Sequence, residues 1–503
     1  MPYTTPIALV LSTLPSATPD VRQRLRDLFD KQLELLMTEV VAFLGQHPSP
    51  TTTFDFEHRI EACLRELGRQ TLKTVYNDLE GDDPDALASH IRVDGEDYRI
   101  NKKKTRQSVD TLFGPIHLWR HLYRPVYRHS GESAIAPLSL ALGVVANATP
   151  ALAEKVGRYL AESGATQRTV QERLRTDHGV SIGTGRLRHL ATHLSGEMAQ
   201  ARERFQVEQL LAWLKQADES RGNRKPVLSV GRDGITLRDY PHGGFEVASA
   251  ATVSVLDRAG KRLGTVYLAF TPEHGQGRMT DQLTRLIEAV LRSWKGLLPR
   301  LTYVTDAGDN ETGYYERVLR PMRHPVTQEP LEWQRVVDFY HVMERVWAMA
   351  GALFGENTPE ARGWARKMRQ LLKKPNGPFR VLHSAAALRK RQSMSPTARK
   401  EFKKAYRYIQ ERTQWMQYHE YKNLHLPRGS GVTEAACKTI FTQRLKLSGM
   451  RWTKPGAQVV LDLRVVLLSG VWDQAYRHIL TTYKYQLFRT PDRKPAHAEL
   501  MAA

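Results

Sequence analysis

The chain has 503 residues, of which 41% are hydrophobic and 25% charged, and its formal net charge is +21. This composition excludes a disordered chain, and the length predicts two to four globular domains. The positive charge predicts attraction to a polyanion, most commonly nucleic acid. An anionic membrane is the weaker alternative, because no apolar run approaches the roughly 20 residues that cross a bilayer.

The first 20 residues hold a short apolar run that no basic residue precedes, so we expect no signal peptide. The two cysteines, Cys63 and Cys437, form at most one disulfide, and no Cys/His spacing resembles a zinc site. We therefore expect a cytoplasmic protein with reduced thiols.

Residues 1–90 are predicted to form an N-terminal helical region, as in VRQRLRDLFDKQLELLMTEVVAFL, which ends at the GDDP of 81–84. Residues 91–145 change to strand patterning, with alternation in VDTLFGPIHLWRHLYR and a tight-turn signal at Asp94-Gly95. The NKKKTR segment makes this second region a small, basic, β-rich module.

Residues 146–200 are predicted to form three short helices, in ATPALAEKVGRYLAESG, TQRTVQERLRTDHG and GTGRLRHLATHL. Two helices joined through Gly179 and the short VSI turn are typical of a helix-turn-helix. Arg186, Arg188 and His189 then fall near the start of the last helix, where such modules contact bases. The alternative is an ordinary helical bundle with solvated arginines.

Residues 201–224 follow as a connecting helix and linker. Residues 225–340 then show three strands (KPVLSVGRDG, GFEVASAATVSVLD, KRLGTVYLAFT), a helix (RMTDQLTRLIEAVLRSWKGLL), a strand (LTYVTD), a short helix and a strand (LEWQRVVDFYH). This order is that of a ribonuclease-H-like fold, although other α/β folds contain parts of it. Residues 341–428 are predicted to be a basic helical insertion, 429–485 the C-terminal helices of the same core, and 486–503 a tail. The fold class expected is multidomain α+β.

Two aspartates end neighbouring strands of this predicted sheet, Asp233 on its first strand and Asp306 on its fourth. Carboxylates that meet there repel each other unless cations lie between them, and Mg²⁺ or Mn²⁺ prefers such oxygen ligands. Glu434, in the first turn of the helix that opens in GSGVTEAACKTIFTQRLKLSGMRW, is the candidate third ligand of a two-metal site. Alternatives remain for each acid: Asp233 in a turn, Asp309 in place of Asp306, and Glu434 as a helix-dipole acid.

The segment GSGVTEAACKTIFTQRLKLSGMRW resembles the catalytic-glutamate signature of the Kra group of bacterial insertion-sequence transposases, relatives of the Mutator-like DDE class. The DG after the first strand, TDAGDN after the fourth and DFYH after the fifth match other blocks of that group, and FGPIHLWRHLYR resembles its N-terminal strand region.

This resemblance implies a DDE transposase in the bacterial cytoplasm, associated with the nucleoid. Its acidic triad falls on Asp233, Asp306 and Glu434 and holds two Mg²⁺ (or Mn²⁺). Asp338 and His341 fit a supporting Asp-x-x-His pair, with a helix N-cap as the alternative. Many relatives carry paired cysteines where this chain has YRPVYRHSGES, so no zinc knuckle is expected.

Further cations on the predicted glutamate helix would hold DNA phosphates, and a tryptophan beyond them would either stack on an unpaired base or pack in the core. These residues are Lys438, Arg444, Lys446, Arg451 and Trp452. The expected function is binding of the element's terminal inverted repeats, cleavage by water, and attack of the freed 3′-hydroxyl on target DNA by a homodimer or larger assembly. The alternatives are a ribonuclease-H-like nuclease without strand transfer and a transposase-derived DNA-binding protein.

Overall fold

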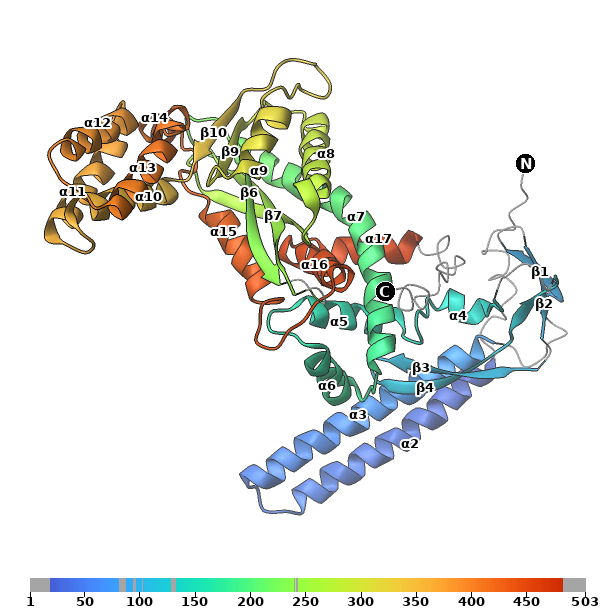
Figure 1. The fold of residues 1–503 in the computed structure, drawn as a ribbon. Helices are drawn as coiled ribbons and strands as arrows, with labels where there is room; N and C mark the ends of the chain where they lie inside the picture. Colours follow the sequence, from blue (N-terminus) through green and yellow to red (C-terminus); the bar gives the residue numbers. More distant parts are fainter. Residues whose placement is uncertain are drawn as a thin grey trace. The chain divides into compact units, whose positions relative to one another are not determined.

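The computed structural model describes residues 19–80, 87–93, 96–101, 103–127, 133–238, 240 and 243–482. It is a mixed α+β chain with two compact units (Figure 1), which confirms the multidomain α+β class. The first unit comprises residues 1–160, 165–197 and 476–503, and the second comprises residues 161–164 and 198–475. The predicted break at GDDP, the turn at Asp94-Gly95 and the tail from 486 lie outside the described residues.

The first unit begins with a helical hairpin of α2 (Pro19–Leu44) and α3 (Pro50–Asp78), as the helix-period pattern predicts. Ser49 caps α3, since its hydroxyl accepts from the Thr52 backbone N–H while the Thr52 side chain accepts from the Ser49 N–H. Pro50 at the first helical position suits a helix start. Near the connecting loop, Phe43 stacks on Phe56 with ring centroids 4.2 Å apart.

The region predicted as strands does form strands. An antiparallel sheet has the order β1 (His90–Val93), β2 (Glu96–Ile100), β5 (Tyr123–Pro125), and β3 (Thr105–Thr111) pairs with β4 (Gly114–Arg120) in a separate ribbon. The Asn77 side chain at the end of α3 bonds the His117 carbonyl and the Trp119 N–H, which fastens the ribbon to the hairpin. A short helix, α4 (Pro137–Ala141), follows.

The three helices predicted after residue 146 are α5 (Pro150–Ala161), α6 (Gln167–His178) and α7 (Thr184–Asp218). Gly179 ends α6 with a left-handed φ of 64°, as expected of a glycine C-cap. The prediction of a separate connecting helix is wrong, because α7 continues unbroken through Gly196 for 35 residues. The buried side chains of Leu194 and Met198 on either side of that glycine stabilise the continuous helix.

The second unit is built on a five-stranded sheet with the order β10-β9-β6-β7-β8. The strands β6 (Val227–Arg238), β7 (Phe245–Leu256) and β8 (Arg262–Phe270) form an antiparallel meander, and β9 (Arg300–Thr305) and β10 (Trp333–Val337) run parallel to β6. Between them lie η2 (His274–Gln276), α8 (Gly277–Ser293), α9 (Asp309–Tyr314) and η3 (Tyr315–Leu319). This sequence of elements is the one predicted.

Helices cover both faces of this sheet (Figure 1). On one face, α8 and the second half of α7 pack through the predicted apolar stripe of α8, which consists of Leu283, Ile287, Val290 and Leu291. On the other face lie α15 (Gly431–Cys437), η5 (Lys438–Thr442) and α16 (Lys454–Leu468), where Ile440, Phe441 and Leu461 pack on small strand residues such as Ala248 and Ala250. The chain continues into α17 (Trp472–Thr482).

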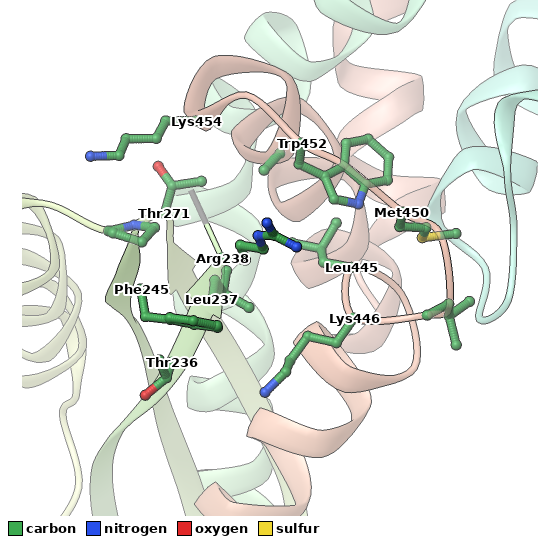
Figure 2. Close-up of a pocket in the computed structure, with 13 residues that line it drawn as sticks. Thr236, Leu237, Arg238, Phe245, Thr271, Leu445, Lys446, Met450, Trp452 and Lys454 are labelled. Atoms are coloured by element: carbon green, nitrogen blue, oxygen red, sulfur yellow. The ribbon is translucent and has the colours of Figure 1, made fainter. Parts of the chain in front are cut away.

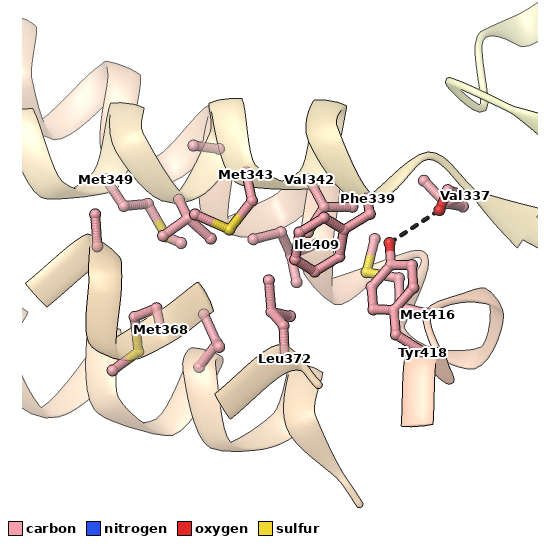
Figure 3. Close-up of a cluster of buried hydrophobic side chains, with 14 of the residues drawn as sticks. Val337, Phe339, Val342, Met343, Met349, Met368, Leu372, Ile409, Met416 and Tyr418 are labelled. Carbon is pink, nitrogen blue, oxygen red and sulfur yellow. Dashed lines mark hydrogen bonds between the residues drawn. The ribbon is translucent and has the colours of Figure 1, made fainter. Parts of the chain in front are cut away.

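The predicted insertion is helical throughout its elements: α10 (Phe339–Phe354), α11 (Pro359–Leu372), α12 (Gly377–Arg389), α13 (Pro396–Gln410), η4 (Thr413–Trp415) and α14 (Tyr418–Asn423). Figure 3 shows its core, in which methionines fill the space between α10, α11 and α13. The hydroxyl of buried Tyr418 donates to the carbonyl of Val337 at 2.9 Å, so the insertion is anchored at the end of β10. Over the described residues, no single helix has the length and apolar character to span a membrane.

Candidate active site

The strand register brings Asp233 and Asp306 level with each other. The β6–β9 ladder pairs Gly231 with Val304; Asp233 lies two residues farther along β6, and Asp306 is the first residue after β9. Adjacent strands lie about 4.8 Å apart, and residues two apart point to the same face. Asp233 accepts from the Gly234 N–H (2.7 Å) and Asp306 from the Gly308 N–H (3.0 Å). The two carboxylates therefore belong to neighbouring chain segments. The prediction that Asp233 ends its strand is wrong, because β6 continues to Arg238 and stays paired with β7 over that length.

The helix that carries Glu434 crosses β6 and β7 at very short range. A Cβ atom at Gly231 would lie 2.0 Å from Thr433 Oγ1, so only glycine leaves room for the helix at this point. The hydroxyls of Thr433 and Thr252 share a hydrogen bond of 2.8 Å, and the Cys437 thiol bonds the Asp233 carboxylate. These contacts fix Glu434, the next residue along α15, over the face from which the aspartates project.

Asp233 is within electrostatic reach of both other acids. Burial raises the pKa of Asp233, and the negative charges of Asp306 and Glu434 raise it further. In the described part of the chain, however, no group of three or more His, Cys, Asp or Glu side chains stands close enough to hold one ion. The Oε1 atom of Glu434 lies 2.6 Å from the Ser430 hydroxyl oxygen and 3.5 Å from His341 Nε2. In this rotamer the Glu434 carboxylate therefore contacts the start of α10 and the N-cap of its own helix.

Asp338 performs the capping role that was one of its two predicted interpretations. It is fully buried, and its carboxylate accepts from the backbone N–H groups of Tyr340 and His341 at the start of α10. It also accepts from both the N–H and the hydroxyl of Ser430, the latter at 2.6 Å. Since the same hydroxyl contacts Glu434, Asp338 is connected to the glutamate through Ser430, which sequence analysis did not single out.

His341 lies on the other side of Glu434. Burial lowers the pKa of His341, but the hydrogen bond with Glu344 and the charges of Glu344, Asp338 and Glu434 outweigh burial, so the pKa lies above its usual value. The Nδ1–Glu344 distance is 3.1 Å. Acidic groups on both sides of the imidazole, Glu344 and Glu434, are thus among the causes of the raised pKa.

A fourth carboxylate, Glu311, was missed. It lies in α9 with 7% of its surface exposed. A Cβ at Gly308 would lie 2.5 Å from Glu311 Oε2 and 3.5 Å from Asp306 Oδ1, so the two carboxyl groups flank this glycine. Burial raises the pKa of Glu311 to about 7, and the charge of Asp306 contributes in the same direction. In sequence it resembles any acid in a first helical turn. Asp309, by contrast, is exposed.

The basic segment after Glu434 is shorter as a helix than predicted. The expected continuous helix is wrong, because α15 and η5 end at Thr442 and Gly449 takes a left-handed φ of 76°. Lys438, Lys446 and Arg451 are exposed. Arg444 is fully buried beside Trp452, with its guanidinium 5.1 Å from the ring centre, so the structure gives it a packing position rather than a surface one.

A cavity of about 360 Å³ lies between this loop and the ends of β6 and β7 (Figure 2). Its walls are mainly apolar, and Trp452 and exposed Phe245 supply aromatic surface. Lys446 and Arg238 add positive charge, whereas Lys454 is paired with Glu246 at 2.8 Å. The cavity is lined by the end of β6, the strand that carries Asp233, and by the loop that follows α15 and η5.

In the first unit, the predicted base-contacting residues differ in availability. Arg188 and His189 are exposed at the start of α7, and Arg188 donates to the Gln167 side chain at 3.3 Å. Arg186 forms an ion pair with the buried Asp110 of β3, and burial lowers its pKa. This partner ties Arg186 to the protein, so the exposed cation nearest to it in sequence is Arg188.

No family model matches the chain. Among curated proteins, it is similar to the UPF0236 protein in the vanSb 3′ region of Streptococcus gallolyticus, with 23% identity over 416 residues. The match covers 80% of this chain and 80% of that protein.

Proposed function

We propose that this chain is a metal-dependent DNA transposase of the DDE class, with a ribonuclease-H-like catalytic core. The observation that carries the proposal is the placement of Asp233 on β6 and of Asp306 directly after the adjacent parallel strand β9, close to the helix that bears Glu434. The antiparallel meander followed by two parallel strands supports the choice of core. The similarity to the streptococcal UPF0236 protein is compatible with the proposal and assigns no activity by itself.

The donor set fits hard divalent cations. Carboxylate oxygens are the ligands that Mg²⁺ and Mn²⁺ accept, and Asp233, Asp306 and Glu434 would hold them. Such ions, when bound, lower the barrier to attack at phosphorus by activating the attacking oxygen and stabilising the leaving one. The protein's own contribution is to position the acids: Cys437 and Gly234 orient Asp233, and Ser430 with His341 keeps the Glu434 side chain ordered.

DNA is the substrate that the surface charge favours. The exposed cations Lys438, Lys446 and Arg451 follow Glu434 in sequence and would contact phosphates near the cut. The cavity beside Trp452 offers aromatic surface to an unpaired base there. In the first unit, α6 and α7 with their short turn would act as the helix-turn-helix that recognises the element's ends through Arg188 and His189.

The reaction would proceed in two displacements at phosphorus. Water cleaves at the element's ends, and the freed 3′-hydroxyl then attacks target DNA, with the same carboxylates positioning both nucleophiles. Because two ends must be joined, we expect a homodimer or larger assembly.

The proposal is tested with DNA fragments from both flanks of the gene. Asp233→Asn, Asp306→Asn and Glu434→Gln should each reduce Mg²⁺-dependent cleavage about a hundredfold or more, since a metal ligand contributes several kcal/mol to the transition state. Binding of the fragments, measured by mobility shift, should remain. Asp309→Asn, an exposed acid near Asp306, is the matched control and should cleave normally. Near-normal cleavage by any of the three variants would show that the substituted residue is not a metal ligand.

Two further results would narrow the function. Cleavage without joining to a target plasmid would leave a nuclease of the same fold, and end binding without cleavage by the unaltered chain would leave a transposase-derived DNA-binding protein. Replacing Arg188 and His189 with alanine should weaken end binding more than binding to random DNA. Equal losses of affinity for the element's ends and for random DNA would show that α7 contacts phosphates without reading the sequence.

A further inference from the structure

The α2–α3 hairpin exposes an apolar stripe along one side. Five large side chains of α2 are at least two-fifths exposed and follow one another at spacings of four, four, four and three residues: Phe29, Leu33, Met37, Val41 and Leu44. Residues at these spacings lie on one helix face. The stripe therefore extends over four turns of α2, from Phe29 to the end of the helix.

The same side of the hairpin carries a groove. A mainly apolar cavity of about 220 Å³ lies between the two helices. Its apolar lining consists of Phe29, Leu33, Leu36, Cys63, Leu64 and Leu67, and Asp30 and Gln32 complete the wall. Phe29 and Leu33 thus belong both to the exposed stripe and to the wall of the groove. The exposed stripe and the groove lie next to each other on one surface. In a two-fold dimer, the stripe of each copy could therefore pack into the groove of the other.

Nothing else among the described residues buries this surface. No residue of α3 is buried, and Gln32 is the one buried residue of α2. The end of α3 packs on β4 through Asn77, whereas Leu64 near its middle and Phe54 near its start are more than half exposed. Soluble monomers rarely leave so continuous an apolar surface in water.

We propose that this face binds the same face of a second copy of the chain, so that the two hairpins form an antiparallel four-helix bundle. The stripe from Phe29 to Leu44 is about 24 Å long, and two helices side by side are roughly 20 Å wide, so each copy offers roughly 500 Å². The two copies together would bury about 1,000 Å², which is the lower bound for a specific interface.

The charges on α2 favour an antiparallel arrangement. Arg22 and Arg26 precede the apolar stripe and lie on its side of the helix, at 100° per residue, while Glu34 borders the stripe farther along. Antiparallel pairing brings Arg22 and Arg26 of one α2 beside the second half of its partner, which carries the exposed Glu34. Parallel pairing would instead place the arginines of the two copies together.

This inference is independent of the proposed function, because it concerns association and not catalysis. It supplies, however, an interface for the assembly that joining two DNA ends requires. If the chain is a dimer without transposase activity, the proposed interface is supported and the proposed function is not. If the chain is an active monomer, the proposed function is supported and the interface is not.

The test is the mass of the full chain in solution, measured by light scattering coupled to size exclusion. We expect twice the chain mass of 57.3 kDa. Leu33→Glu and Met37→Glu should each weaken the dimer at least about a hundredfold, because a charged side chain would enter the apolar interface. Leu35→Glu is the matched control: Leu35 is 48% exposed against 55% for Leu33 but points about 160° away on the helix, so its variant should stay dimeric.

Circular dichroism would show whether each variant is folded, and cross-linking of mixed isotope-labelled chains gives a readout that needs no substitution. Lys31 of one copy should link to lysines of the other copy's hairpin. A monomeric unaltered chain, a dimer that Leu33→Glu leaves intact, or links confined to other surfaces would each overturn the proposal. A monomer that becomes dimeric when residues 1–18 are removed would also overturn it, by assigning the face to that segment.

Discussion

Replacing Glu311 with glutamine should make the second unit more stable at high pH and leave it unchanged at low pH. Burial raises the pKa of Glu311 to about 7 from an ordinary value of 4.5, and the charges of Asp306 and Asp233 add to the effect. An acid whose pKa is raised by folding binds its proton more tightly in the folded state. Folding therefore costs nothing extra below pH 4.5, the cost grows between pH 4.5 and 7, and it is complete above pH 7.

The magnitude follows from the two pKa values. A tenfold change in an equilibrium corresponds to about 1.4 kcal/mol, so a pKa moved from 4.5 to about 7 corresponds to roughly 3 kcal/mol of lost stability at pH 8. Glutamine has a similar shape and carries no charge, so Glu311→Gln should recover most of this difference at pH 8. At pH 4.5 the two proteins should unfold at nearly the same denaturant concentration.

Tryptophan fluorescence during urea unfolding measures this selectively, because eight of the nine tryptophans lie between residues 198 and 475 and Trp119 is the exception. The buffers should contain a chelator, since a bound divalent cation would itself lower the pKa of a neighbouring carboxyl group. Asp309→Asn, on the exposed side of the same helix, should follow the unaltered protein at every pH. Parallel stability curves for Glu311→Gln and the unaltered chain from pH 5 to 8 would refute the argument that burial dominates this group.

Three other substitutions test contacts that position the site. Gly231→Ala should destabilise the second unit by about 1–3 kcal/mol, because the new Cβ would clash with Thr433 Oγ1. Adding Thr433→Ala should restore part of the lost stability. Equal thermal midpoints for Gly231→Ala and the unaltered chain would contradict this prediction. Ser430→Ala should lower the free energy of unfolding by about 1 kcal/mol. It should also lower any Mg²⁺-dependent cleavage, because Glu434 would be less well positioned. Loss of stability without loss of cleavage would limit Ser430 to a structural role. Tyr418→Phe should lower the free energy of unfolding in urea by about 1–2 kcal/mol, because the buried Val337 carbonyl would lose its hydrogen-bond donor. An unchanged urea midpoint would show that another group donates to this carbonyl.

Local pattern was sufficient to predict most elements of the chain. The period of the hairpin helices, the alternation in the small β module and the order of strands and helices from residue 225 onward depend on near neighbours, and they appear in the structure as expected. Asp233 and Asp306 were predicted to end adjacent strands. The strands β6 and β9 are adjacent and Asp306 directly follows β9, but Asp233 lies within β6, which continues to Arg238. The N-cap role of Asp338 was also foreseeable from its position before a helix.

Other features depend on contacts between residues far apart in the chain. An acid at Glu311 has the same local pattern as a solvated helix-dipole acid, and only its burial beside Asp306 sets it apart. Ser430 bonds both Asp338, 92 residues away, and Glu434, one turn away, which no sequence spacing indicates. Arg186 and Arg444 look like exposed cations in the sequence. In the structure Arg186 is paired with Asp110, and Arg444 is buried.

The sequence by itself determined which segments become helices or strands and which end of the sheet carries acids, because side-chain periodicity and capping act over a few residues. Tertiary structure alone decided how near α15 comes to β6, which rotamer Glu434 adopts and which charges lose their water. Those outcomes depend on close packing and on desolvation, and both are properties of the assembled fold rather than of any short segment.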